Sequence, residues 1–244
     1  MVGIVVPPSG PDEMPDLKWG LLPQTDYRVD DDWLTVGMRG TGSNTLIVDD
    51  AFVPDYRCIN PWDVSAGTAP GVAVNPSPLY RLPFGPALAF YLAAPALGTA
   101  ERTLDDWATY MKGKRAAFTG AEVGKQQPTL IRAGHLSAKL ASARLLMTTT
   151  PRAIDAAIEQ GSLDTELRVR AGRNATYAVR LCVDVVEECM QFSGGTGLFE
   201  SHPVQRGWRD VHGVAAHVGF NPDTAYGSYG NVLLDLPVPP SPML

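Results

Sequence analysis

Hydrophobic positions alternate over short distances in the first part of the chain. Runs rich in Val, Ile and Leu recur between Pro, Gly and Asp residues, at residues 3–6, 33–36, 44–48 and 51–53. Alternating or clustered apolar runs bounded by turn residues are typical of β-strands. The first run has the character of an interior strand, although no strand precedes it in this sequence. We therefore expect an incomplete antiparallel β-domain over residues 1–75.

The pattern becomes helical after residue 84, where Ala, Leu, Arg and Glu recur at spacings of three and four residues. The stretch from Ser65 to Pro83 is rich in Pro and Gly and predicts no packed element, and we place the linker at residues 76–84. Pro151 is expected to kink or interrupt a helix. Long helices with short connections predict an up-down bundle over residues 85–244, and hence an α+β fold class. The expected helices are 86–112, 127–160, 163–192, 203–220 and 222–234.

Composition and charge exclude several classes of partner. The 244 residues carry 20 Lys and Arg against 26 Asp and Glu, and the net charge of −6 offers no attraction to nucleic acid or anionic lipid. No apolar run reaches the ~18 residues that a membrane-spanning helix requires. The three cysteines, Cys58, Cys182 and Cys189, show neither a disulfide framework nor a metal-ligand spacing. We expect a cytoplasmic protein without a metal site, with Cys182 and Cys189 buried as small hydrophobic residues.

Two glycine- and arginine-containing segments are candidates for binding an anion. Gln191 precedes Gly194 and Gly195, and glycines let a backbone approach a ligand and present N–H donors to it. The same glycines are also typical of a helix C-terminal stop. Arg115, near Phe118 at a helix-to-helix turn, can hold a phosphate through two parallel hydrogen bonds, or it can be an exposed arginine at a helix end. The residues alone leave these alternatives open.

A helix over residues 203–220 would place ionisable side chains on one face. At 100° per residue, one stripe within about 60° holds Arg206, Asp210, Gly213 and His217. Arg206 and Asp210 are spaced to pair at i,i+4. A carboxylate on the face of His217 can fix the tautomer of the imidazole and raise its basicity. The stripe therefore predicts either an ionisable pocket wall or a solvated helix face with one ion pair.

Four segments in this order resemble the acyl-CoA dehydrogenase superfamily, and more closely its oxygenase branch, the two-component reduced-flavin-dependent aromatic monooxygenases. They are residues 33–57, the turn with Arg115, Phe118 and Gln127, residues 191–197 and residues 203–210. The resemblance implies a β-domain joined to a helical bundle, assembled as a homotetramer with flavin between the two. It also implies that an N-terminal helical domain and the first strands of the β-domain lie outside this chain.

The resemblance implies a cofactor and partners as well. It assigns Arg115, Phe118, Gln191, Gly194 and Gly195 to a flavin site that a neighbouring subunit shares. Reduced flavin, with FMN favoured over FAD, would come from a separate flavin reductase. The substrate would be a small phenolic or polycyclic aromatic compound that is hydroxylated with O2.

The catalytic residues implied by the two branches differ. Dehydrogenases of the superfamily commonly carry a catalytic Glu shortly after the Arg-Asp pair, and no Glu lies between Ser201 and the C-terminus. The oxygenase branch places a His there, which His217 matches, so we expect a flavin-dependent monooxygenase. His217 would hydrogen-bond or deprotonate the phenol, while Asp210 and Arg206 orient its helix. The alternatives are an acyl-CoA dehydrogenase-like flavoprotein and a non-catalytic bundle that acts in oligomerisation.

Overall fold

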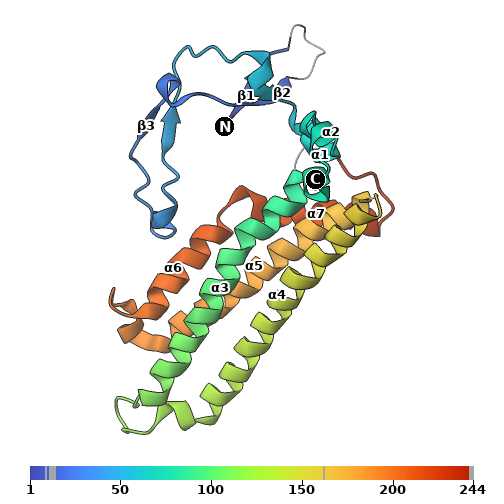
Figure 1. Ribbon diagram of the computed structural model, residues 1–244. Coiled ribbons are helices and arrows are strands. Elements are labelled where there is room, and N and C mark those ends of the chain that lie inside the picture. The colour runs from blue at the N-terminus through green and yellow to red at the C-terminus, as the bar shows by residue number, and fades with distance from the viewer. Residues whose placement is uncertain (9, 11–14, 162, 242–244) are drawn as a thin grey trace. The chain divides into compact units, whose positions relative to one another are not determined.

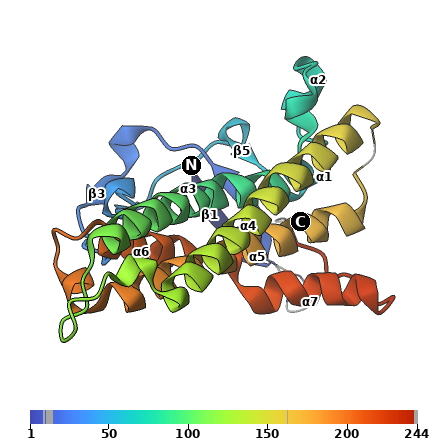
Figure 2. The same cartoon turned by 90° about the horizontal axis from the view of Figure 1, so that it is seen from below.

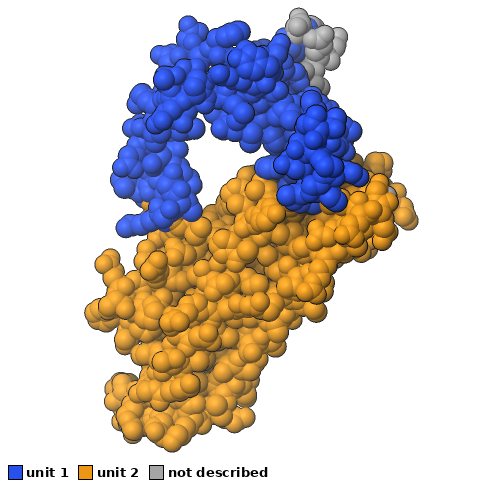
Figure 3. All heavy atoms as spheres, in the orientation of Figure 1, with its two compact units in different colours: residues 1–34, 39–85, 239–244 blue, residues 35–38, 86–238 orange. Residues whose placement is uncertain are grey.

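The chain divides into two compact units, coloured blue and orange in Figure 3. The computed structural model describes residues 1–8, 10, 15–161 and 163–241. Unit 1 comprises residues 1–34, 39–85 and 239–244, and unit 2 comprises residues 35–38 and 86–238. The short segment 35–38 therefore packs with the second unit although its neighbours on both sides belong to the first.

Unit 1 is built from short antiparallel strands, as the apolar pattern predicts. A three-stranded sheet has the order β1-β2-β5, and a separate two-stranded ribbon pairs β3 with β4. Two short helices, α1 and α2, follow β5. The elements are β1 (Val2–Val6), β2 (Asp16–Gly20), β3 (Arg28–Asp30), β4 (Thr45–Ile47), β5 (Cys58–Ile59), α1 (Pro61–Ala66) and α2 (Gly71–Val74).

Three predictions for this region were wrong. Residues 33–36 and 51–53 form no strand in the described part of the chain. For the first of these runs the reason is that side chains satisfy its backbone: the N–H of Trp33 donates to Oδ1 of Asn44 at 3.1 Å. The Pro- and Gly-rich stretch 65–83 holds α2 and a 3₁₀ turn, because Pro at a first helical position and Ser77 as a cap start the turn at Pro78–Arg81.

Unit 2 confirms the predicted up-down helical bundle, with α3, α4 and α5 lying alongside one another in both views (Figures 1 and 2). α5 packs against α4, α6 and α7. Cys182 and Cys189 are buried on α5, which confirms them as core residues, and burial raises the pKa of each thiol to about 12. The helices are α3 (Phe84–Gly113), α4 (Gln127–Glu159), α5 (Thr165–Ser193), α6 (Pro203–Ala215) and α7 (Pro222–Leu233).

Two details of the bundle differ from the prediction. Pro151 does not interrupt α4, which runs from Gln127 to Glu159, because loss of one backbone hydrogen bond is offset by core residues on both sides, Thr150 and Ile154, which are buried. The helix predicted over 203–220 ends at Ala215. Beyond it, a 3₁₀ turn at Val218–Phe220 buries the ring of Phe220, which a continued helix would not place in the same position. Among the described helices, none combines the length and apolar character that crossing a bilayer requires.

Candidate functional site

The Asp210 carboxylate fixes a segment of chain on the flank of α6. Its Oδ1 accepts a hydrogen bond from the N–H of Met38 at 2.7 Å, and Nη1 of Arg209 donates to the carbonyl oxygen of Val36 at 2.8 Å. Gly37 lies between these two bonds. A β-carbon on Gly37 would lie 2.1 Å from the carbonyl oxygen of Arg209, so only glycine permits this approach. Two side chains and one glycine therefore set the register of the segment on α6.

The other residues of the predicted stripe on α6 differ in how much they help to hold the segment of residues 35–38. A β-carbon on Gly213 would lie 2.8 Å from Cγ of Met38, so this glycine also admits the segment. The predicted i,i+4 pair between Arg206 and Asp210 is present, but its atoms are 3.8 Å apart and the Arg206 side chain is 81% exposed. Such a pair stabilises little. Sequence analysis assigned no site role to Arg209, whose Nε donates to Oε1 of Gln205 at 2.7 Å.

His217 does not share a helix face with Asp210, which corrects the predicted stripe. Its backbone is extended, with φ −65° and ψ 137°, and it caps the 3₁₀ turn that leads to α7. Nδ1 of His217 accepts a hydrogen bond from the N–H of Gly219 at 3.0 Å. A ring nitrogen that accepts carries no proton, so the neutral imidazole has its proton on Nε2. The exposed ring therefore presents an N–H donor.

Several predicted cofactor residues gather where α3 and α5 end. Nζ of Lys114 donates to the carbonyl oxygens of Phe192 and Ser193 at 3.1 and 2.9 Å, which ties the turn after α3 to the last turn of α5. Gly194 then ends α5 with a φ of 69°, so the helix-stop interpretation of this glycine is correct. Sequence analysis missed Lys114. Its signal is a cation that meets the carbonyl groups of a helix C-terminus.

The turn between α3 and α4 presents Arg115 and Phe118 to solvent. Arg115 pairs with Glu122 across the turn, and its Nη1 donates to the carbonyl oxygen of Gly120 at 3.1 Å. The Arg115 side chain is 67% exposed, and the nearer Glu122 carboxylate oxygen is 3.9 Å away. Phe118 is fully exposed. The backbone of this turn is ordered by its own hydrogen bonds, so a large apolar side chain is held away from the core.

Gln191 is oriented by a carboxylate that also contacts α6. Oε1 of Glu187 accepts from Nε2 of Gln191 at 3.1 Å, and Oε2 accepts from Nε1 of Trp208 at 2.6 Å. The hydrogen bond from Trp208 is the main cause that lowers the pKa of Glu187, although partial burial opposes it. The ring of His212 contacts that of Trp208 in a tilted arrangement, with centroids 4.5 Å apart and planes inclined by 41°. Glu187 therefore couples the end of α5 to the middle of α6.

The predicted site residues are spread along the bundle: α6, which carries Arg206 and Asp210, contacts the middle of α3 at Thr103. A β-carbon on Gly219, two residues after His217, would lie 4.0 Å from Leu92, near the start of α3. Lys114 follows the end of the same helix. At 1.5 Å per residue, the roughly 20 residues between these points span about 30 Å. Within one chain, His217 and the group with Arg115, Gln191 and Gly194 do not form a single site.

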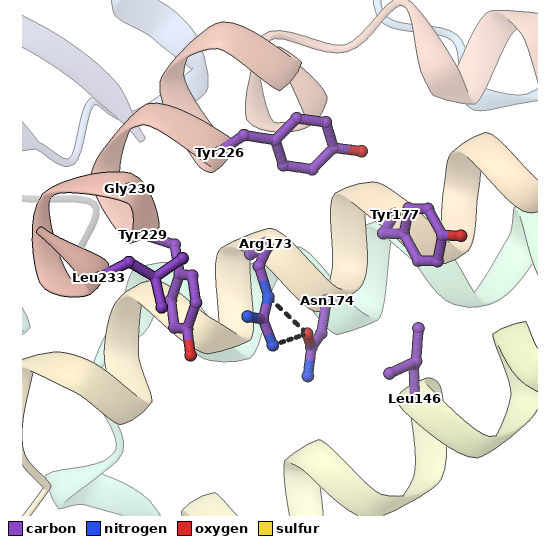
Figure 4. A pocket seen from close by; sticks show the side chains of 8 residues that line it. All are labelled: Leu146, Arg173, Asn174, Tyr177, Tyr226, Tyr229, Gly230 and Leu233. Atoms are coloured by element: carbon purple, nitrogen blue, oxygen red, sulfur yellow. Dashed lines mark hydrogen bonds between the residues drawn. The ribbon is translucent and has the colours of Figure 1, made fainter.

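A pocket of about 520 Å³ lies between α4, α5 and α7 (Figure 4). The residues that line it include none of the predicted site residues. Tyrosines from α5 and α7 and the guanidinium of Arg173 dominate its wall. The sequence gives no periodic or motif-like signal for this pocket, because its lining comes from three helices far apart in the chain.

Known proteins resemble this chain over most of its length. It is 34% identical over 220 residues to the flavin-dependent monooxygenase, oxygenase subunit HsaA, of Rhodococcus jostii strain RHA1, covering 89% of this chain and 58% of that protein. It is 29% identical over 228 residues to the FADH(2)-dependent resorcinol hydroxylase, oxygenase component, of Rhizobium sp. strain MTP-10005, covering 88% and 55%. The crystal structure of 3-HSA hydroxylase from Rhodococcus sp. RHA1 superposes with a TM-score of 0.86 at 34% identity, covering 94% of this chain and 59% of that one.

These coverages mean that the chain spans a little more than half the length of the relatives it matches. The similarity extends across both the β-rich region and the bundle, in agreement with the predicted α+β class. Residues 90–222, from α3 to the start of α7, match the family described as acyl-CoA dehydrogenase, C-terminal domain. Because this match covers more than half of the chain, the protein belongs to the family of the acyl-CoA dehydrogenase C-terminal domain.

Proposed function

We propose that this chain belongs to the oxygenase component of a two-component flavin-dependent monooxygenase. The enzyme hydroxylates a phenolic or polycyclic aromatic compound with O2 and reduced flavin from a separate reductase. The observation that carries the proposal is the exposed imidazole of His217, which stands with a defined N–H donor where a dehydrogenase of the superfamily would carry a carboxylate. The similarity to a resorcinol hydroxylase and to HsaA supports the same reaction class.

His217 acts on the substrate as a hydrogen-bond donor. Because Nδ1 accepts from Gly219, Nε2–H is the atom that can reach a phenol oxygen. A donor at that oxygen stabilises the phenolate form, and a phenolate ring is more nucleophilic than a phenol ring. Removing the phenol proton at Nε2 would require the other tautomer, which breaks the hydrogen bond with Gly219. The donor role is therefore favoured over the base role that the sequence left open.

The cluster where α3 and α5 end fits the phosphate portion of a flavin. Lys114 and Arg115 bring two positive charges to one end of the bundle. A β-carbon on Gly195 would meet no atom within 4 Å, so the backbone there is open to a ligand. When bound, reduced flavin supplies the activation of O2. The family resemblance favours FMN, whereas the name of the resorcinol hydroxylase specifies FADH(2), so the decisive titration uses both flavins.

Two copies of the chain are needed to complete one site. The separation of about 30 Å between the phosphate cluster and His217, estimated from the helical rise, exceeds the distance from phosphate to reactive ring in either flavin. We therefore assign the phosphate contacts of Arg115, Gln191 and Gly195 to one copy and His217 to another, within the homotetramer that the sequence suggests. Phe118, exposed on an ordered turn, is suited to contact the flavin or the partner copy.

The test uses purified protein that contains this chain. Reduced FMN and reduced FAD are titrated anaerobically, oxygenated buffer with resorcinol is added, and hydroxylated product is quantified. We expect flavin binding and product for the native protein, and His217→Ala should lose most product while the flavin dissociation constant changes less than about threefold. His217→Gln, which keeps an N–H donor, should recover part of the activity.

Three outcomes would contradict the proposal. Flavin binding without any hydroxylated product would overturn oxygenation. Bleaching of bound oxidised flavin by an acyl-CoA would identify a dehydrogenase instead. A failure to bind either flavin would favour the non-catalytic bundle.

A further inference from the structure

We propose that the pocket between α4, α5 and α7 binds a small aromatic carboxylate, at a site separate from His217 and the phosphate cluster. The pocket volume of about 520 Å³ lies in the range of roughly 300–1,000 Å³ that small-molecule sites occupy. The proposal does not depend on the oxygenase function, because it rests on the charge and shape of this pocket alone.

The guanidinium of Arg173 lies in the pocket wall without a counter-ion. Among the residues that the structure describes, no carboxylate lies within ion-pair distance of it. Its Nε and Nη2 both donate to Oδ1 of Asn174, at 3.0 and 2.8 Å. Asn174 is fixed in turn by a 2.8 Å hydrogen bond from its Nδ2 to Oγ1 of Thr150. The described residues offer no acceptor to Nη1 of Arg173, which can therefore donate to an anion.

Aromatic rings shape the rest of the wall. The Arg173 guanidinium stacks on the ring of Tyr229, with its carbon 3.8 Å from the ring centroid. Figure 4 shows Tyr177 on α5 and Tyr226 on α7 further along the same wall. Burial is the main cause that raises the pKa of Tyr226, so this phenol stays protonated near neutral pH and can donate a hydrogen bond. Leu146 supplies an apolar surface from α4.

This combination selects the chemical class of the ligand. Tyrosine faces and a leucine favour a flat ring system, since aromatic rings stack with offset or edge contacts. The charged guanidinium favours an anion, and a carboxylate oxygen is a suitable acceptor for Nη1, which Asn174 leaves unoccupied. A neutral aromatic compound would leave the charge of Arg173 without a counter-ion, and an aliphatic acid would make no ring contact with Tyr177 and Tyr226. A ligand of one or two fused rings with one carboxylate satisfies both.

Binding would also join two helices. The ring system would lie against α5 and α7 together, and α7 begins five residues after His217. A ligand that binds only the native state raises the apparent stability of the protein. We therefore expect occupancy of the pocket to raise the thermal midpoint.

The test uses 2-naphthoate as the probe, with 2-naphthamide as its neutral isostere, and measures heat of binding and thermal midpoint on the full chain. We expect saturable binding of 2-naphthoate and at least about tenfold weaker binding of the amide, which is the size of one charge-assisted hydrogen bond. Arg173→Gln should weaken 2-naphthoate to the same degree. Arg152→Gln removes the same charge from an exposed position on α4 outside the pocket and should leave the affinity unchanged.

A second pair of variants keeps the test valid if Arg173→Gln misfolds. A β-carbon on Gly230 or on Gly227 would meet no atom within 4 Å, so α7 accepts a side chain at either position. Only Gly230 lines the pocket. Gly230→Leu should abolish 2-naphthoate binding, whereas Gly227→Leu should retain it. Absence of binding by the native chain, or equal affinity in Gly230→Leu and Gly227→Leu, would overturn the proposal and would leave the flavin experiment untouched.

Discussion

Gly207 lets α6 approach α3 more closely than any other residue would. A β-carbon there would lie 1.9 Å from Oγ1 of Thr103, and that hydroxyl is fixed by a 2.7 Å hydrogen bond to the carbonyl oxygen of Thr99. Gly207→Ala should therefore lower the free energy of unfolding by about 1–3 kcal/mol, through overpacking of a buried contact. Urea denaturation followed by circular dichroism measures this change.

Gly98 provides the matched control for that substitution. It is an exposed glycine of α3 at which a β-carbon would meet no atom within 4 Å. Gly98→Ala should raise the free energy of unfolding by about 0.5–1 kcal/mol, because alanine loses less backbone entropy in a helix. If Gly207→Ala raised the free energy of unfolding as Gly98→Ala is expected to, the close contact at Gly207 would not limit stability.

At the residue scale, the sequence predicts which side chains are buried better than it predicts which hydrogen bonds a polar side chain makes. The buried cysteines follow from their positions on an apolar helix face, and burial confirms them. The proton position on His217 does not follow from spacing, because it depends on a hydrogen bond within a turn of three residues. The role of Asp210 is similar: its partner is the backbone of Met38, 172 positions away in the sequence.

The hydrogen bond between Glu187 and Trp208 makes the contact between α5 and α6 depend on pH. Its effect lowers the pKa of Glu187 below the ordinary 4.5, so the stabilisation is complete above pH 4.5 and is lost as the pH falls through the lowered value. Trp208→Phe should therefore destabilise the protein most near pH 7 and less at pH 3. Urea midpoints measured across this range test the trend.

The corresponding control removes the carboxylate. In a Glu187→Gln background, the cost of Trp208→Phe should no longer vary between pH 5 and pH 3, because the titrating partner of the indole is gone. A slope that persists in this background would assign the pH dependence to other groups.

The segment of residues 35–38 depends on α6 for its order. Asp210→Ala removes the acceptor of the Met38 N–H, and we expect the hydrogen exchange rate of that amide to rise at least about tenfold. Arg206→Ala should change the rate far less, since the exposed Arg206 side chain contacts Asp210 only through a 3.8 Å ion pair, which stabilises little. Equal exchange in the two variants would show that Asp210 does not hold the segment.

At the element scale, long periodic helices could be predicted because their apolar repeats extend over many turns. The short runs of unit 1 could be predicted only in part, since an apolar run becomes a strand only when a partner strand is available: runs 3–6 and 44–48 contain strands, and runs 33–36 and 51–53 do not. Residues 33–36 show the difference: the carbonyl of Val36 accepts from the side chain of Arg209 instead of from a neighbouring strand. The sequence predicts an α6 that is too long, because the burial of Phe220 is a tertiary contact that spacing does not reveal. The chain leaves the helix after Ala215 and forms the 3₁₀ turn that buries this ring.

At the scale of the whole molecule, a substitution at Phe118 can distinguish an effect on folding from an effect on flavin binding or assembly. Its ring makes no contribution to the core, so Phe118→Ser should change the free energy of unfolding by less than about 0.5 kcal/mol. If the ring contacts flavin or a partner copy, the same variant should weaken flavin binding, measured by fluorescence titration. Tyr56→Ser, at another exposed aromatic residue, should change neither quantity. A loss of stability in Phe118→Ser would contradict the separation.

The distance between the two site clusters is the property of the whole molecule that sequence could not supply. The motifs with Arg115, Gln191 and His217 are recognisable one by one, but their order in the chain does not tell which end of the bundle each occupies. Only the antiparallel course of the helices shows how far His217 lies from the group with Arg115 within one chain.

The imidazole of His217 is carried by a solvent-facing connection, residues 216–219, between two packed helices. Side chains on such a connection can be exchanged at small cost in stability, because no core atom is displaced. The same bundle can therefore carry different side chains at position 217 without a change in its core. New reactivity in this scaffold is to be sought by varying four surface positions while every helix is left intact.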